Sequence, residues 1–322
     1  MKQEGEMQEK VKKSFLDGYT RMEKKNFKFV ALLLIFPVLQ FLVFYVYINF
    51  SSFVLAFTDR SGNFDLKYME IIFKEFARTD GGSLWLYLFR SVGQWAISTF
   101  INFPITILFT YALFKHVKGE MFFRVLFYLP NIIGTVVFAS LYYYVVAADG
   151  PLLTILNGLN IPISDELQMF GFLDYGDTAL GSIIVFGIWL ALGGNTIVLT
   201  GAMTRIPEEI FESGRLEGIG VWREFFQMVC PLIWSTISTL LIFQLAAITT
   251  FDFGTFLLMG ENAVKEVSTM GYHIFMLTYN VSRGAEVANK PAALGLIITV
   301  ITVPIVMICR AVIEKLTDTV EF

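Results

Sequence analysis

The sequence is poor in the side chains that most often build disulfides and metal centres. Its 322 residues include only two cysteines and two histidines. Cys230 and Cys309 lie within or beside apolar runs, and His116 and His273 are far apart in the sequence. These positions offer neither a disulfide framework nor a metal-ligand spacing. We therefore expect no disulfide and no bound metal.

The sequence also lacks the phosphate-binding loop Gly-x-x-x-x-Gly-Lys-Ser/Thr, through which many ATPases hold nucleotide. Its apolar runs contain no cluster of His, Cys or carboxylate residues that could form a catalytic centre within a membrane. We therefore expect that the chain is not an enzyme and binds no cofactor of its own.

Apolar residues are abundant instead. They make up 55% of the chain, which includes 33 phenylalanines, whereas soluble domains average about 45–50%. A helix needs about 20 apolar residues to cross a bilayer. Six runs approach or exceed this length, at residues 29–50, 86–114, 122–147, 178–203, 230–251 and 291–309. The pattern predicts an all-α membrane protein with six spans over 29–313, between hydrophilic tails at 1–28 and 314–322.

Basic residues predict the orientation of these spans, because cytoplasmic segments of membrane proteins are enriched in Lys and Arg. With both termini cytoplasmic, sixteen of the 24 Lys and Arg residues fall on the inner side and eight on the outer side. Eight of the sixteen lie in the tail 1–28, where acidic residues interrupt the basic ones and argue against a nucleic-acid partner. We expect a multi-pass membrane protein with both termini and the loop 204–227 on the cytoplasmic side.

The longest polar segment among the apolar runs begins at Pro207 and reaches the apolar run at Pro231. Pro207 suits the start of a helix, and Glu208 and Glu209 favour its positive N-terminal dipole. Gly218 permits a sharp turn with positive φ. The segment therefore predicts two short helices joined by a turn at the membrane surface, with Ser213 and Gly214 small enough for another surface to approach the backbone.

The spacing of this segment resembles the EAA loop of binding-protein-dependent ABC importer permeases. That motif has Glu and two small residues, then Gly after three residues, and an apolar-x-apolar-Pro ending nine residues later. Here the matching positions are Glu212, Ser213, Gly214, Gly218 and Pro231. The competing interpretation is an ordinary amphipathic loop between two spans, which would require no such spacing.

The resemblance extends over nearly the whole chain and is closest to the first permease of carbohydrate-uptake transporters, through strings such as Thr250-Phe-Asp-Phe253. It implies a type I ABC importer permease fold in the bacterial cytoplasmic (inner) membrane, in which residues 204–231 form the coupling helices. It also implies a second permease subunit, cytoplasmic ATPase subunits that carry ATP and Mg, an extracytoplasmic solute-binding protein, and a sugar or oligosaccharide substrate. The five motif residues would contact or shape the surface that meets the ATPase.

Polar residues inside spans are costly in lipid and are therefore candidates for contact with substrate. The candidates are Asn131, Tyr142, Asn195 and Gln244. The alternative role for each is hydrogen bonding between helices, which is common in membranes. A self-sufficient secondary transporter is the alternative function, but it would require ionisable residues within the spans, and these runs are nearly free of them.

Overall fold

The computed structural model describes residues 21–78, 83–263, 265–284 and 287–317. Helices dominate this part of the chain, which contains no strand beyond an isolated bridge between Thr58 and Phe64. The predicted all-α class is therefore confirmed. The chain divides into two compact units, residues 1–55 and 56–322, and each is described by itself.

The first unit is a long apolar helix. Its segments are α1 (Arg21–Gln40), the π-helix η1 (Phe41–Tyr47) and α2 (Ile48–Ala56). Within it, Leu32–Ala56 is apolar and long enough to cross a membrane, so the predicted first span continues about one and a half turns beyond Phe50. The helix begins at Arg21, inside the predicted tail 1–28, of which residues 1–20 lie outside the described part of the chain.

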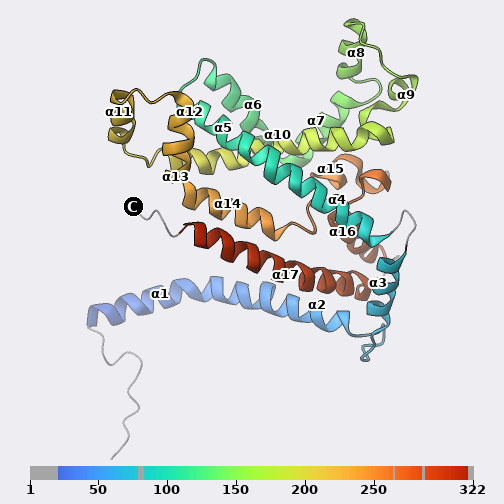
Figure 1. The fold of residues 1–322 in the computed structure, drawn as a ribbon. Coiled ribbons are helices and arrows are strands. Elements are labelled where there is room, and N and C mark those ends of the chain that lie inside the picture. Colours follow the sequence, from blue (N-terminus) through green and yellow to red (C-terminus); the bar gives the residue numbers. More distant parts are fainter. Residues whose placement is uncertain (1–20, 79–82, 264, 285–286, 318–322) are drawn as a thin grey trace, which may run out of the picture. The chain divides into compact units, whose positions relative to one another are not determined.

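The second unit contains α10 (Gly176–Met203), an uninterrupted helix of 28 residues (Figure 1). This helix packs against the second span and against helices of the third and fifth spans. The second span consists of α4 (Leu84–Ile97), η2 (Ser98–Asn102) and α5 (Phe103–Phe114). The last span, α17 (Asn289–Thr317), packs on α14 (Trp234–Ala246), α3 (Lys67–Ala77) and α16 (Met270–Ser282).

The third predicted run, 122–147, contains Pro130, and proline is expected to break a helix, but the break falls at another residue. Pro130 lies inside α6 (Glu120–Ile133), and the break falls at Gly134, before α7 (Thr135–Val146). Gly134 has φ 96°, which glycine adopts without a steric cost. Pro130 cannot donate to the carbonyl of Leu126, but the indole Nε1 of Trp189 on α10 donates to that oxygen at 3.2 Å. A tertiary hydrogen bond thus replaces the one that proline removes.

The fifth span also differs from the predicted run 230–251. Helix α12 (Val221–Glu224), η3 (Phe225–Val229) and α13 (Cys230–Leu232) follow one another, and the chain then breaks at Ile233 before α14. The bend at this break is 73°. Pro231 therefore lies inside α13 and does not begin the span, while α14 ends at Ala246, before turns at 247–250.

Five described helices are apolar and long enough to cross a membrane, or six if this bent pair is one span. One of the five is Thr135–Gly158, which comprises α7 and α8 (Pro151–Gly158) and leaves α6 outside it, so this candidate span begins and ends later than the predicted run 122–147. Helices outside the candidate spans also include α9 (Asp165–Asp174), α11 (Glu208–Leu216), α15 (Thr255–Met259) and the short η4 (Gly260–Asn262) and η5 (Lys265–Val267).

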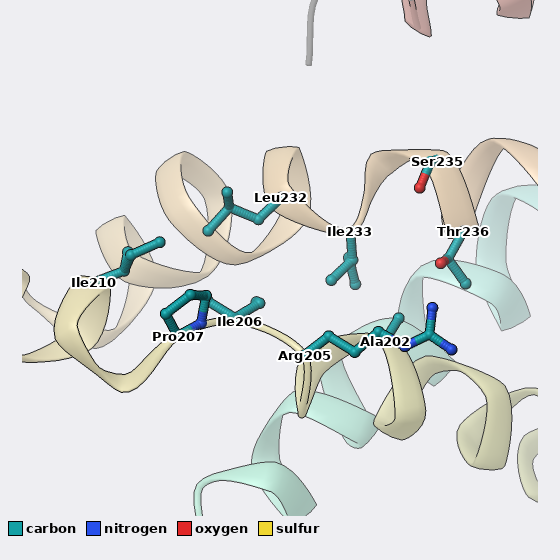
Figure 2. Close-up of a pocket in the computed structure, with 9 residues that line it drawn as sticks. All are labelled: Ala202, Arg205, Ile206, Pro207, Ile210, Leu232, Ile233, Ser235 and Thr236. Carbon is teal, nitrogen blue, oxygen red and sulfur yellow. The ribbon is translucent and has the colours of Figure 1, made fainter. Parts of the chain in front are cut away.

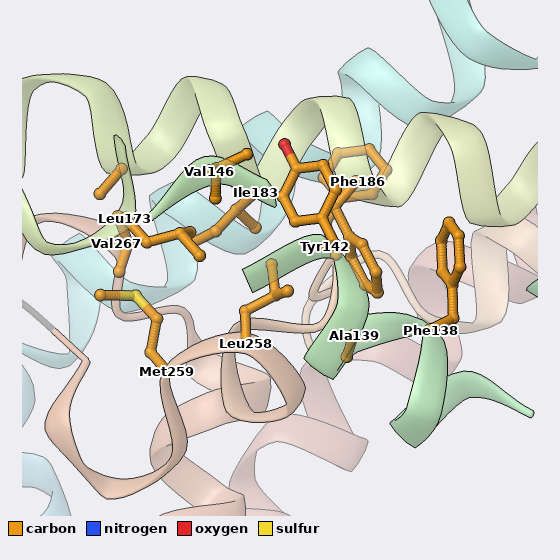
Figure 3. Packing of buried hydrophobic residues seen from close by; sticks show 12 residues of the cluster. Phe138, Ala139, Tyr142, Val146, Leu173, Ile183, Phe186, Leu258, Met259 and Val267 are labelled. Carbon is orange, nitrogen blue, oxygen red and sulfur yellow. The ribbon is translucent and has the colours of Figure 1, made fainter. Parts of the chain in front are cut away.

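One apolar cluster joins α7, α10 and the α15 region (Figure 3). The ring of Phe186 on α10 lies 5.5 Å from that of Phe138 and 5.2 Å from that of Tyr142. A separate cluster packs the loop that follows α10 against α5, with Phe211, Phe225 and Tyr111 among its members. The loop is therefore part of the folded unit and shares a core with helices of the second, fourth and fifth spans.

Candidate coupling site

The segment after α10 forms two short helices with a tight turn between them, as predicted. Pro207 precedes α11, and Glu208 and Glu209 occupy its first turn. At the other end, the Gly218 N–H donates to the carbonyl of Arg215 at 3.1 Å, and the Ile219 N–H donates to that of Gly214 at 3.0 Å. This pair of bonds is a Schellman closure, which places a left-handed residue just beyond the helix.

Gly218 supplies that left-handed residue, with φ +72°. The expected positive φ is therefore confirmed. A Cβ built on Gly218 would meet no heavy atom within 4 Å. A larger residue at position 218 would therefore cause backbone strain and no steric clash. Glycine is favoured here because the turn requires a positive φ.

Gly214 has a different role from the predicted one. It is buried, and an added Cβ would lie 3.0 Å from Met228 Cε and 3.2 Å from Met228 Sδ. Its small size therefore lets η3 pack against α11 within the chain, and does not leave backbone open to another surface. Ser213 is exposed, and its hydroxyl donates to the carbonyl of Ile210 at 3.0 Å.

The outward surface of the two helices combines exposed apolar side chains with exposed charged ones, which are Glu208, Glu209, Glu212, Arg215, Glu217 and Arg223. Glu212 is exposed and forms no ion pair with the described residues. Leu216 is 90% exposed, and Trp222 and Phe226 are exposed with their rings stacked at 6.2 Å. Exposed aromatic and aliphatic side chains around a charged group are typical of a surface that a partner protein covers.

The bend at Ile233 leaves a cavity of about 330 Å³ beside the first of these helices. Pro207 and Ile210 line one wall, and Leu232 and Ile233 line the wall opposite, with the guanidinium of Arg205 nearby (Figure 2). Pro231 is exposed at this bend. The motif's proline therefore lies where the surface segment turns into α14.

Sequence reasoning missed a charged contact that joins the loop to α5. Glu224 is only 8% exposed, and its carboxylate pairs with the Lys115 ammonium. The same carboxylate oxygen accepts a hydrogen bond from the Tyr111 hydroxyl at 3.0 Å. The available signal was an acidic residue directly before Phe225-Phe226, but its partners lie more than 100 positions away in the sequence.

Two of the four predicted substrate residues bond to neighbouring helices. The Tyr142 hydroxyl is buried and donates to the carbonyl of Ser182 at 2.8 Å. The Gln244 side-chain oxygen accepts a hydrogen bond from the Thr99 hydroxyl at 2.9 Å, and its backbone carbonyl accepts one from Trp95 Nε1 at 3.0 Å. These contacts match the alternative role of hydrogen bonding between helices.

Of the other two, Asn131 lies where α6 crosses α10 at Gly193, and Asn195 follows Gly193 by two residues on α10. A Cβ on Gly193 would lie 2.3 Å from Asn131 Nδ2 and 2.2 Å from the carbonyl oxygen of Phe127, so Gly193 permits the close crossing. Asn131 is exposed and Asn195 is half-buried. Neither amide forms a hydrogen bond within the described part of the chain. Both amides therefore remain able to bind a polar group.

Comparisons with known proteins identify relatives along most of the chain. The chain is 23% identical over 206 residues to the trehalose transport system permease protein SugA of Mycobacterium tuberculosis (strain H37Rv), which covers 63% of this chain and 64% of SugA. It is 25% identical over 278 residues to the polygalacturonan/rhamnogalacturonan transport system permease protein YteP of Bacillus subtilis (strain 168), covering 84% and 85%. The matched part of the chain thus spans less than two thirds of the length of SugA.

Solved structures of this fold are also known. The chain superposes on a chain of a bacterial ABC transporter involved in the import of the acidic polysaccharide alginate, with a TM-score of 0.75 and 20% identity. The superposition covers 92% of this chain and 100% of that one. A chain of the alginate transporter in complex with its pentasaccharide-bound periplasmic protein gives a TM-score of 0.74. The fold is therefore that of an ABC importer permease, as predicted.

The family match includes the loop, its buried contacts and the spans around them. Residues 102–319 match the family described as "Binding-protein-dependent transport system inner membrane component". The matched range contains all nine predicted site residues, from Asn131 to Gln244. The chain belongs to this family of inner-membrane transport components.

Proposed function

We propose that this chain is one of two permease subunits of an ATP-driven importer, and that residues 204–231 couple it to cytoplasmic ATPase subunits. The observation that carries this proposal is the loop geometry: α11 and α12 meet at Gly218 with φ +72°, and Glu212 and Leu216 face outward. The chain has no phosphate-binding loop, so ATP and Mg would be bound by the partner.

Glu212 would pair with a basic residue of the ATPase, and the apolar side chains of Leu216 and Trp222 would fill its groove. Interfaces of this kind bind through a few buried aromatic or aliphatic side chains, while charge complementarity selects the partner. Closure of the ATPase dimer would then displace the loop together with the spans that share its core. Such rigid movement of helices about a central site is the usual basis of alternating access.

The proposed solute is a sugar or an oligosaccharide, delivered by an extracytoplasmic binding protein. The printed names of relatives specify trehalose and polygalacturonan or rhamnogalacturonan, and the matched structures belong to an alginate importer. Carbohydrates require donors and acceptors within an otherwise apolar site, and Asn131 and Asn195 supply both. With its loop and termini inside, the chain would span the inner membrane six times.

The self-sufficient secondary transporter is not retained, because the chain belongs to a family whose members work in binding-protein-dependent systems. The discriminating experiment is purification of the tagged chain after mild solubilisation. We expect a second permease and an ATPase to co-purify, and binding-protein-stimulated uptake of at least one sugar from trehalose, an oligogalacturonide and an alginate oligosaccharide. Uptake by the chain alone in liposomes, without an ATPase, would contradict the proposal.

A further inference from the structure

Glu224 and Lys115 form a buried ion pair between the second surface helix and the end of α5. Glu224 is 8% exposed, and the Lys115 side chain is largely covered. The Tyr111 hydroxyl, one helical turn before Lys115, donates to the same Glu224 oxygen at 3.0 Å. The carboxylate is thus held by two groups of α5, each from a different turn.

Aromatic rings surround this pair and connect it to the first surface helix. The Lys115 ammonium lies 4.7 Å from the centre of the Phe211 ring on α11. The Phe114 ring on α5 also lies 5.6 Å from that of Phe211, and the Tyr111 ring lies 5.0 Å from that of Phe225. Both halves of the loop therefore meet α5 at one place.

Simple stabilisation does not explain a charged pair in these surroundings. Removing two charges from water is costly, and apolar residues of similar size often stabilise a buried site equally well or better. What an ion pair with a hydrogen-bonded tyrosine adds is fixed geometry, because its partners tolerate little displacement. A contact of that kind transmits movement between the elements that it joins.

We propose that Tyr111, Lys115 and Glu224 are positioning residues that form a coupling latch, through which displacement of the loop moves α5. Because α5 continues through η2 into α4, the movement would extend along the whole second span. This inference rests on the proposed coupling role of the loop. It adds a specific prediction, that transport can be uncoupled from ATP hydrolysis without any change to the outward surface of the loop.

The test uses the complete transporter in liposomes with its binding protein and whichever of the three panel sugars the wild type takes up best. We compare Glu224→Gln, Lys115→Met, the double variant and Tyr111→Phe. Glu314→Gln is the matched control, because Glu314 pairs with Arg310 at an exposed site on α17. The readouts are ATPase co-purification, ATP hydrolysis with and without binding protein, and sugar transported per ATP.

We expect each single charge variant to retain the ATPase while the sugar transported per ATP falls by at least about tenfold, because removing one partner leaves the other buried charge unpaired. The sugar transported per ATP by the double variant should be no lower than that of the poorer single variant, because the two substitutions remove the same interaction. Tyr111→Phe, which loses only a hydroxyl group, should lower the same ratio by about threefold. It keeps the test informative if a charge variant fails to assemble.

Two results would overturn the latch. One is a wild-type ratio of sugar to ATP in Glu224→Gln and Tyr111→Phe, and the other is additive losses in the double variant. Gly218→Val separates this failure from failure of the proposed function. If Gly218→Val abolishes transport while Glu224→Gln does not, the loop couples without the latch; if neither variant matters, the coupling role itself is wrong.

Discussion

Met228 lies directly against Gly214, so that a Cβ on Gly214 would stand 3.0 Å from Met228 Cε. This contact joins α11 to η3 on the side of α11 away from the exposed carboxylate of Glu212. The two small residues of the motif, Ser213 and Gly214, therefore have different roles. Gly214 closes the loop internally, while Ser213 remains at the surface.

Larger residues at position 214 should force the two helices apart. Gly214→Leu should destabilise the loop by about 1–3 kcal/mol, as overpacking of a tight contact does. Gly214→Ala should be nearly neutral, because the flexible end of Met228 can shift and alanine favours the helix by about 1 kcal/mol. Thermal unfolding of the purified complex measures both, with Ser213→Ala as the control. Equal stability of Gly214→Leu and wild type would show that Met228 does not restrict this position.

Acidification should destabilise the region around His273. Burial lowers the pKa of His273 from its ordinary value of 6.5, and within the described part of the chain its Nε2 has no hydrogen-bond partner. The unfolded chain therefore binds a proton more readily than the folded chain, and the stability contributed by the neutral ring is lost as the pH falls below about 6.5.

The melting temperature should accordingly fall between about pH 7.5 and pH 5.5, the range over which histidine titrates. His273→Gln should reduce that dependence, whereas His116→Gln should not, since His116 is exposed beside Glu120. An unchanged pH dependence in His273→Gln would assign the acid sensitivity to other groups.

The half-buried amide of Asn195 on α10 should affect recognition more than architecture. Asn195→Ala should lower sugar uptake about tenfold, as loss of a hydrogen bond to a bound ligand does, while assembly and basal ATP hydrolysis stay near normal. Tyr142→Phe is the matched comparison, because its hydroxyl bonds to Ser182 within the core. It should lower stability by about 1 kcal/mol without changing which sugar is transported. Wild-type uptake by Asn195→Ala would assign Asn195 to helix packing.

Much of this site could be predicted from the sequence because its geometry is local. Gly218 follows a helix and precedes another, and glycine is the residue that most readily takes a positive φ. The partner of Gly214 could not be predicted, since the side that α11 buries depends on where η3 folds. The same applies to Glu224 and Lys115, which tertiary packing brings together from different spans.

The breaks in the spans show the same limit. Proline suggested a break at Pro130, but the Trp189 indole supplies the hydrogen bond that the carbonyl of Leu126 would otherwise lack. Gly134, four residues later, breaks the helix instead. At the fifth span, the bend falls at Ile233, a residue with no turn preference of its own. Glycine favours the break at Gly134 locally, whereas the bend at Ile233 depends on the surrounding packing, which local preference does not reveal.

The predicted orientation can be tested from outside the cell. Cysteines introduced singly at Lys12, Lys67, Asp165 and Arg215, with Cys230 and Cys309 replaced by serine, are exposed to an impermeant thiol reagent. We expect labelling only at Lys67 and Asp165, because the basic segments should face the cytoplasm. Lys12 lies outside the described residues, so its position follows from the sequence pattern alone. Labelling at Arg215 in intact cells would contradict the six-span topology.

The coupling role of the loop is the central claim, and one pair of variants tests it most directly. Gly218→Val introduces a branched side chain at φ +72°, where strain of about 1–3 kcal/mol is expected. Glu212→Lys leaves the backbone unchanged and reverses the exposed charge, which should repel a basic partner. Neither residue lies in a candidate span, so both variants should insert normally.

The measurement is sugar uptake, ATP hydrolysis and ATPase co-purification on the same preparations of wild type, Gly218→Val and Glu212→Lys. We predict that both variants reach the membrane and lose transport, either because the ATPase dissociates or because hydrolysis no longer responds to the binding protein. Transport at the wild-type rate by both variants, with the ATPase still attached, would contradict the claim that this loop couples the permease to ATP hydrolysis.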